Sequence, residues 1–171
     1  DHLLSIARPN IGVITNIGIS HFEFFQNVDA IATEKGKIAQ ALKDNETLIV
    51  NADNSTALQQ QSKTQANVLS YGFTDSAKVR TEITNEQFQN PLGAQLSITT
   101  PTRQLGVTIN ALGQPHYLAV TAAVAVGEAL NIQTDLIIKG LQGYRPSPGR
   151  LNIIAGIKHS TIIDDTYNAS P

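Results

Sequence analysis

The chain has 171 residues, with 12 basic and 14 acidic side chains and a formal net charge of −2. This length fits one domain with a sizeable core, and the absence of a basic block argues against a nucleic-acid partner. Without cysteine the chain has neither disulfides nor thiolate metal sites. No apolar run approaches the roughly 20 residues that span a bilayer, and no signal-peptide pattern opens the chain. We therefore expect a cytoplasmic protein without membrane insertion.

The first part of the chain alternates between helical and strand patterns of hydrophobicity. The pattern predicts helices over residues 2–7, 27–43 and 55–64, and strands over residues 11–16, 47–50 and 68–71. The first helix ends before Pro9, since the residue before a proline avoids helical angles. Strands that are separated by helices pair in parallel through right-handed crossovers. We therefore expect an α/β fold with a mostly parallel sheet flanked by helices.

Beyond Gly72 the pattern changes to strands without intervening helices. Strands are predicted near residues 79–83, 94–99 and 105–110, separated by turns that contain Pro, Gly or Asn. Such strands pair antiparallel, so we expect them to form a small antiparallel sheet beside the main one.

The last third of the chain predicts two helices and a final strand pair. An Ala-rich helix over residues 117–130 is apolar on nearly every side, which indicates that it packs between the sheet and neighbouring elements. A helix over residues 134–141 has Thr134 as its predicted N-cap. Segments 151–157 and 160–163 then form a predicted hairpin or strand pair.

Polar residues follow the predicted parallel strands at the points where these strands end. Thr15 and Asn16 end the first strand, Asn51 and Asp53 end the second, and Asp164 and Asp165 end the last. Ligands bind beyond the carboxyl ends of parallel strands, so these residues mark a candidate binding rim. The turn-forming tendency of asparagine explains each position equally well.

An acidic pair, Asp164 and Asp165, follows the last apolar segment. Two adjacent carboxylates repel each other, and they usually persist where a metal, a sugar hydroxyl or a cationic group compensates them. The alternative is an ordinary acidic turn. The chain starts at Asp1, ends shortly after this turn and contains no methionine, so we expect it to be a piece of a longer protein.

Lys35 interrupts an apolar stripe on the helix predicted over residues 27–43. Residues 31, 35, 38 and 42 share one helical face, and the other three are Ile31, Ile38 and Leu42. One interpretation is that the methylenes of Lys35 are buried while its ammonium reaches water. The sharper interpretation is a buried lysine that is chemically modified or adjacent to a metal.

Two histidines and one arginine are further candidates. His21 lies in a loop shortly after the first strand, where its imidazole could reach a cation, although a lone loop histidine is more often a surface residue. His116 directly precedes the Ala-rich helix and could equally serve the helix N-terminus. Arg150 closes a Pro- and Gly-containing turn, and its guanidinium suits either phosphate recognition or simple solvation.

Four ordered blocks carry a family resemblance. They are ARPNIGVITNIGISHFEFF, AIATEKGKIAQAL, LIVNADN and PSPGRLNIIAGIKHSTIIDDTYNASP. With these blocks the chain resembles the ATP-dependent Mur ligases, most closely the type that adds D-alanyl-D-alanine to UDP-N-acetylmuramoyl tripeptide. Folylpolyglutamate synthetases and the ligases that add diaminopimelate or lysine share the first three blocks, but they carry a DYAH-like sequence where this chain has Asp-Thr-Tyr-Asn.

The resemblance implies a domain organisation and a metal site. Residues 1–164 would be most of a P-loop-type central ATP-binding domain that lacks its N-terminal part, and residues 165–171 the start of a hinge to a C-terminal domain. His21 matches the family histidine that coordinates Mg²⁺. Lys35 matches the lysine that is carbamylated and helps to hold this ion.

The same resemblance implies a site for ATP. Arg150 matches the residue that approaches the ATP phosphates and, with Lys35 and His21, would be catalytic. Asp165 matches the acid near the nucleotide ribose. His116 and Asn168 are expected in the same cofactor site, Asn168 at the hinge. The implied reaction forms an acyl phosphate from ATP and the substrate carboxylate, and the dipeptide amine then displaces phosphate.

Two departures from the family pattern keep alternatives open. The phosphate loop G-x-x-G-K-[ST] is absent from this chain, so the chain alone should not ligate. Val120 stands where the family has an asparagine that contacts adenine, so adenine recognition is altered, weakened or supplied elsewhere. The alternatives are a related folylpolyglutamate-type or other Mur-type amide ligase, and a non-catalytic binding module that retains the fold.

Overall fold

The computed structural model describes residues 2–18, 27–88 and 92–167. Its main sheet has six strands in the order β1-β2-β3-β4-β5-β6. These strands are β1 (Ile11–Ile14), β2 (Thr47–Asn51), β3 (Asn67–Gly72), β4 (Val79–Gln87), β5 (Gly93–Thr99) and β6 (Gln104–Ile109). The pairs β1–β2, β2–β3 and β3–β4 are parallel, whereas β4–β5 and β5–β6 are antiparallel. The expected α/β fold with a mostly parallel, helix-flanked sheet is confirmed.

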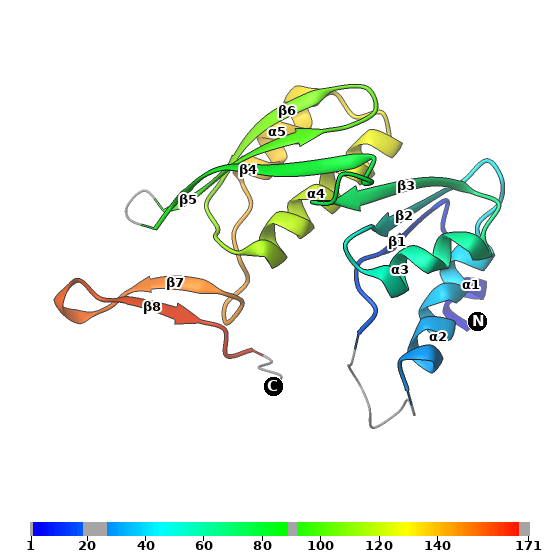
Figure 1. The fold of residues 1–171 in the computed structure, drawn as a ribbon, viewed down its shortest axis with the longest axis horizontal. Coiled ribbons are helices and arrows are strands. Elements are labelled where there is room, and N and C mark those ends of the chain that lie inside the picture. The colour runs from blue at the N-terminus through cyan, green and yellow to red at the C-terminus, as the bar shows by residue number, and fades with distance from the viewer. Residues whose placement is uncertain (1, 19–26, 89–91, 168–171) are drawn as a thin grey trace.

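The helices and the remaining strands follow the predicted order. The helices are α1 (His2–Ile6), α2 (Val28–Ala41), α3 (Ser55–Gln59), α4 (Gln114–Ala129) and α5 (Thr134–Gln142), with short 3₁₀ turns η1 (Gln60–Lys63) and η2 (Ile157–His159). Strands β7 (Asn152–Ala155) and β8 (Thr161–Asp164) form a separate antiparallel pair. This hairpin extends away from the main sheet (Figure 1).

The small antiparallel sheet exists, but its place differs from the expectation. It consists of β7 and β8, whereas the strands of residues 79–109 extend the main sheet. Two residue pairs, Tyr71–Val79 and Gly72–Arg80, join β3 to β4 in parallel and make the sheet continuous.

The predicted N-cap of α5 is wrong. Gln133 holds the N-cap position, and the hydroxyl of Thr134 accepts a hydrogen bond from Arg103 instead.

The central strand β2 is buried on both faces, as its unbroken apolar sequence requires. Leu48 and Val50 pack into a core with α2 and α3, whereas Ile49 packs into a second core with α4. In Figure 1, α2 and α3 lie below the parallel strands and α4 crosses the middle of the molecule. None of the helices in the described ranges combines the length and hydrophobicity that a bilayer crossing requires.

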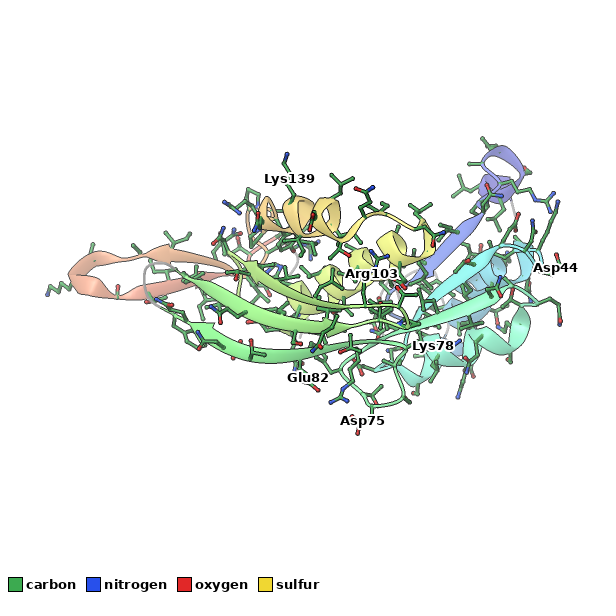
Figure 2. The ribbon with its side chains drawn as sticks, turned by 90° about the horizontal axis from the view of Figure 1, so that it is seen from above. Asp44, Asp75, Lys78, Glu82, Arg103 and Lys139 are labelled. Carbon is green, nitrogen blue, oxygen red and sulfur yellow. The ribbon has the colours of Figure 1, made fainter. Side chains whose placement is uncertain are left out.

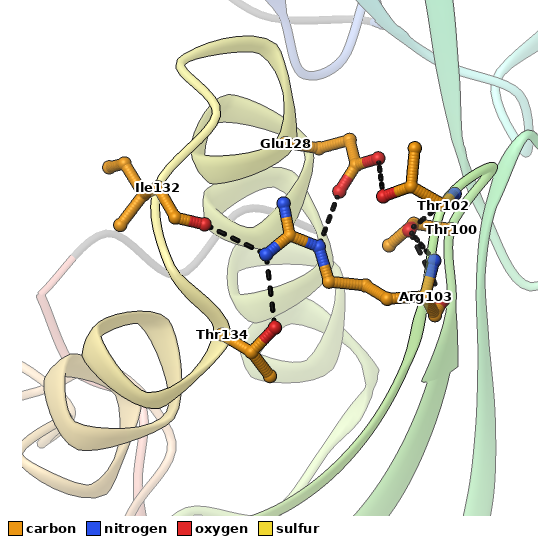
Figure 3. Close-up of polar contacts among 6 residues, drawn as sticks. All are labelled: Thr100, Thr102, Arg103, Glu128, Ile132 and Thr134. Atoms are coloured by element: carbon orange, nitrogen blue, oxygen red, sulfur yellow. Dashed lines mark hydrogen bonds and ion pairs between the residues drawn. The ribbon is translucent and has the colours of Figure 1, made fainter.

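A partly buried ion pair fastens the antiparallel half of the sheet to the helices. Arg103 Nε lies 2.9 Å from Glu128 Oε2, and Arg103 Nη1 donates to Ile132 O at 2.8 Å (Figure 3). Thr102 Oγ1 donates to the other Glu128 oxygen at 2.5 Å. Burial alone would raise the pKa of Glu128, but the bonds from Thr102 and Arg103 prevail and lower it. By contrast, the side chains of Asp44, Asp75 and Lys139 lie at the periphery of the molecule (Figure 2).

We predict that Glu128→Gln lowers the free energy of unfolding by about 2–3 kcal/mol, because it leaves the Arg103 charge without its counter-charge. Glu82→Gln is the matched control, since Glu82 pairs with Arg80 at the exposed surface and should cost less than about 1 kcal/mol. Urea denaturation of both variants measures the difference. Equal losses would contradict a stabilising role for the Arg103–Glu128 pair.

Candidate functional site

The chain that leaves β1 is held by side chains from three other segments. The carbonyl groups of three successive residues each accept a hydrogen bond from a side-chain nitrogen: Thr15 O from Asn51 Nδ2 at 2.9 Å, Asn16 O from Lys35 Nζ at 2.8 Å, and Ile17 O from Asn54 Nδ2 at 3.2 Å. A chain that leaves a strand loses its ladder partners, so its carbonyls need other donors. The carboxyl end of β1 is therefore a built polar site.

Asn51, which ends β2, and Asn54, which follows it, both have structural roles. Asn51 is 4% exposed, and its Oδ1 accepts from Asp53 N at 2.9 Å, which shapes the turn. Asn54 is the N-cap of α3, where its Oδ1 accepts from Ala57 N at 2.7 Å. Each of these side chains thus shapes a turn and also makes a tertiary contact, and Asn51 lies at the predicted edge of the sheet, beside the end of β1.

Asp53 lies at the same edge of the parallel strands, but its carboxylate binds the turn after β3 rather than the chain after β1. Its two carboxylate oxygens accept from Phe73 N at 2.8 Å and from Thr74 N at 2.9 Å. The carboxylate thereby closes the turn that follows β3. A Cβ at Gly72 would lie 2.6 Å from Asp53 Oδ2, so only glycine leaves room for this contact.

The structure corrects the predicted environment of Lys35. The buried residues of α2 are Ile31, Ala32, Gly36 and Ala39, and Lys35 itself is exposed. The lysine therefore lies beside the buried stripe rather than in it, which excludes the deeply buried amine. Its ammonium nevertheless turns back to the sheet and meets Asn16 O, as described above.

A pocket of about 580 Å³ lies beside this site, and Lys35 and Asn16 belong to its wall. The remaining wall comes from α1, β1 and the outer face of α2, and it is mainly apolar: the other lining residues are Leu3, Leu4, Val13, Ile14, Thr15, Glu34, Lys37 and Ile38. The predicted metal ligand His21 lies outside the described residues, as does Asn168.

A second polar cluster surrounds the start of α4. His116 is 6% exposed; its Nε2 lies 3.1 Å from Arg150 O and its Nδ1 lies 2.7 Å from Tyr144 Oη. A backbone carbonyl only accepts, so Nε2 carries a hydrogen; burial lowers the pKa of His116 and keeps the ring neutral, so Nδ1 accepts from the tyrosine. His116 is therefore a neutral connector between α4 and the segment around Arg150.

Arg150 and Asp165 face the same loop but do not pair with each other. The Arg150 guanidinium carbon lies 4.2 Å above the ring of Tyr167. Asp165 Oδ1 accepts from Leu151 N at 3.2 Å. Gly149 has φ +71°, and a Cβ there would lie 2.9 Å from Tyr167 N, so glycine is required for this close approach.

Asp164 ends β8 and Asp165 follows it, and β8 belongs to a separate sheet, so the acidic pair does not extend the rim of the parallel strands as predicted. The two acids have different roles. Asp164 Oδ1 accepts from both the backbone N and the hydroxyl of Thr166, which is an ordinary turn. Asp165 alone lies in the cluster with Arg150. The structure thus brings together His116, Arg150 and Asp165, and no hydrogen bond or ion pair joins them to Lys35 within the described ranges.

Sequence reasoning missed the contributions of Asn54, Tyr144 and Tyr167. Asn54 was explained by its turn propensity alone, so its tertiary hydrogen bonds were not predicted, and the two tyrosines belong to no periodic pattern.

Val120 is 1% exposed and packs in the core, so this face of α4 is turned to the sheet. Beside it, burial and the contact with Glu86 raise the pKa of Tyr117 to about 12, so its hydroxyl donates to Glu86.

The described residues contain no cluster of three or more His, Asp or Glu that could hold a metal. At the end of β1 the nearby charged group is the Lys35 ammonium, which repels a cation. Mg²⁺ needs few protein ligands when phosphates and water complete its octahedron. A magnesium site here therefore fits only if Lys35 becomes an anion and if His21 and phosphate oxygens contribute.

Comparison with known proteins identifies the similar families. The Mur ligase middle domain matches residues 1–127. The UDP-N-acetylmuramoyl-tripeptide–D-alanyl-D-alanine ligase of Bacillus subtilis is 30% identical to this chain, and the match covers 100% of this chain and 36% of the relative. The corresponding ligase of Escherichia coli is 28% identical, and the match covers 98% of this chain and 37% of the relative. A UDP-N-acetylmuramate–L-alanine ligase from Clostridium beijerinckii is 28% identical over 92% of this chain and 34% of the relative. The chain thus spans little more than a third of these relatives.

Solved structures of Mur ligases share the fold of this chain. MurF from Acinetobacter baumannii has a TM-score of 0.82 and 29% identity over 95% of this chain and 35% of that chain. MurF from Thermotoga maritima in complex with ADP has a TM-score of 0.80 and 25% identity, and the match covers 99% of this chain and 38% of that chain. A UDP-N-acetylmuramoyl-L-alanyl-D-glutamate–2,6-diaminopimelate ligase has a TM-score of 0.68 and 18% identity, and the match covers 88% of this chain and 31% of that chain. This similarity shows a shared fold.

The environment of His116 predicts a pH dependence of stability. Burial lowers its pKa below 6.5, against smaller opposing effects of the Arg150 carbonyl and the Asp165 charge. Below pH 6.5 the unfolded chain therefore binds a proton that the folded chain does not, so stability is lost as the pH falls. We predict that the wild-type advantage over His116→Gln shrinks between pH 7.5 and 5.5 in urea denaturation, by at most about 1.4 kcal/mol per pH unit. A constant difference would contradict this assignment.

Proposed function

Because this chain belongs to the Mur ligase family through its middle domain, we propose that it is part of an ATP-dependent amide ligase that adds D-alanyl-D-alanine to UDP-N-acetylmuramoyl tripeptide. The observation that carries this choice is the gap between TM-scores of about 0.8 with MurF and 0.68 with a diaminopimelate ligase. In this proposal residues 1–164 belong to the central ATP-binding domain and residues 165–171 begin the hinge to the next domain.

Lys35 is the proposed metal-holding residue. The ammonium first loses a proton; CO₂ then adds to the neutral amine with release of a second proton, and the resulting carbamate is a carboxylate-like ligand at the end of β1. Together with His21, this carbamate would hold Mg²⁺, which supplies charge compensation for the transferring phosphoryl group. The contact between Lys35 and Asn16 supports the role, because it holds the side chain at the rim of the parallel strands.

The cluster around Arg150 is the proposed nucleotide site. Arg150 would compensate the phosphate charge, Asp165 would accept a hydrogen bond from the ribose, and His116 would hold the Arg150 segment against α4 through its carbonyl. Asn168 would complete the site from the hinge. The buried Val120 cannot reach a base, so base recognition is assigned to residues other than those of α4.

The direct test uses the full-length protein with ATP, Mg²⁺, UDP-N-acetylmuramoyl tripeptide and D-alanyl-D-alanine. Phosphate release that requires all four components is expected, because an acyl phosphate forms first and the dipeptide amine then displaces phosphate. Release with L-alanine or a folate acceptor instead would identify a related amide ligase. No release with any acceptor would favour a non-catalytic binding module, which the burial of Val120 makes the second candidate.

We predict that Lys35→Ala lowers kcat of the full-length enzyme by at least about 100-fold, since the metal and phosphoryl group lose their positioning. Added short carboxylates should restore part of the activity by replacing the carbamate. Lys78→Ala is the matched control: this exposed lysine also donates to a backbone carbonyl, Val68 O at 2.6 Å, but at the amino end of β3, so its loss should leave kcat within about two-fold. Full turnover in Lys35→Ala would exclude the proposed role.

A further inference from the structure

The amide of Asn54 connects three parts of the fold. Its Oδ1 begins α3 by accepting from Ala57 N at 2.7 Å. Its Nδ2 donates to Asn16 Oδ1 at 2.5 Å and to Ile17 O at 3.2 Å, across 38 and 37 residues of sequence. Both amide hydrogens of Asn54 are therefore used to hold the chain that leaves β1.

Asn16 is the link between Asn54 and Lys35. Its side chain accepts from Asn54, and its carbonyl accepts from the Lys35 ammonium at 2.8 Å. Lys35 is exposed, and a lysine side chain is long, flexible and strongly hydrated. A hydrogen bond to a carbonyl can keep such a group in place only if the carbonyl itself is fixed.

The residue type at position 54 supports this connection. Serine, aspartate and asparagine serve about equally well as N-caps. Only asparagine adds two N–H donors to the capping oxygen. The second and third partners of Asn54, which are both acceptors, therefore account for the choice of an amide at this cap.

We propose that Asn54 is a positioning residue for Lys35: by fixing Asn16 it holds the lysine amine at the carboxyl end of β1. Asn54 needs no contact with substrate for this role. The catalytic consequence rests on the proposed function, whereas the geometric link between Asn54 and Lys35 does not.

The test compares Asn54→Ser and Asn54→Asp in the full-length protein with Asn27→Ser. Both Asn54 variants keep a capping oxygen and lose the amide donors. Asn27 caps α2 in the same way, with Oδ1 accepting from Ala30 N at 2.9 Å, and so controls for a changed cap. We expect kcat to fall about 10- to 100-fold in both Asn54 variants, because misplacing a catalytic group by about 1 Å lowers the rate by up to about this factor. We also expect both variants to need more Mg²⁺ for half of the maximal rate. The control should stay within about two-fold, and the thermal midpoints of all three should be similar.

A second measurement does not depend on activity. Crystal structures of full-length wild type and Asn54→Ser give the distance between Lys35 Nζ and Asn16 O, which should exceed hydrogen-bonding range in the variant alone. Retention of this bond in Asn54→Ser, or wild-type kcat in both Asn54 variants of an active enzyme, would overturn the positioning role. If wild type is inactive with every acceptor, the proposed function fails, while the distance still decides the role of Asn54.

Discussion

The arrangement of the N-terminal half depends on how the chain satisfies its carbonyls after β1. Three side-chain nitrogens, from α2, from the last residue of β2 and from the loop after β2, donate to three successive carbonyls of residues 15–17. Parallel strands end together at one edge, so each departing chain can use side chains of its neighbour. The same bonds therefore fix the helix α2, the cap of α3 and the direction in which the chain leaves β1.

The sheet also carries the second cluster, although that cluster is far away in sequence. Its two faces support separate cores, with α2 and α3 on one side and α4 on the other. The Arg103–Glu128 pair secures the antiparallel extension to the end of α4 (Figure 3). At the other end of α4, His116 holds the backbone of Arg150. Helix α4 therefore fixes the loop that contains Arg150 relative to the main sheet.

Hydrophobic periodicity was sufficient to predict the order of helices and strands, but it placed Lys35 in the wrong environment. The buried side of α2 includes Gly36, which hydropathy does not mark as a contact residue; a Cβ there would lie 2.3 Å from Gln60 Oε1. The six-stranded sheet was missed because only two residue pairs join β3 to β4. Patterns in the sequence singled out the candidate residues and the family resemblance assigned their roles, whereas Asn54 and Tyr167 act through tertiary contacts that no local pattern reveals.

The two clusters have complementary chemistry, which bears on how the proposed reaction would use them. The cluster at the end of β1 offers an amine that needs modification before it can bind a cation, whereas the Arg150 cluster already offers a guanidinium and a carboxylate. Strands β2 and β3 point toward the side of the molecule that carries the β7–β8 hairpin (Figure 1). A triphosphate with Mg²⁺ at one end and its ribose at the other is a ligand whose charges match both clusters. In the proposed enzyme, therefore, the ligand rather than a protein contact would connect Lys35 with Arg150.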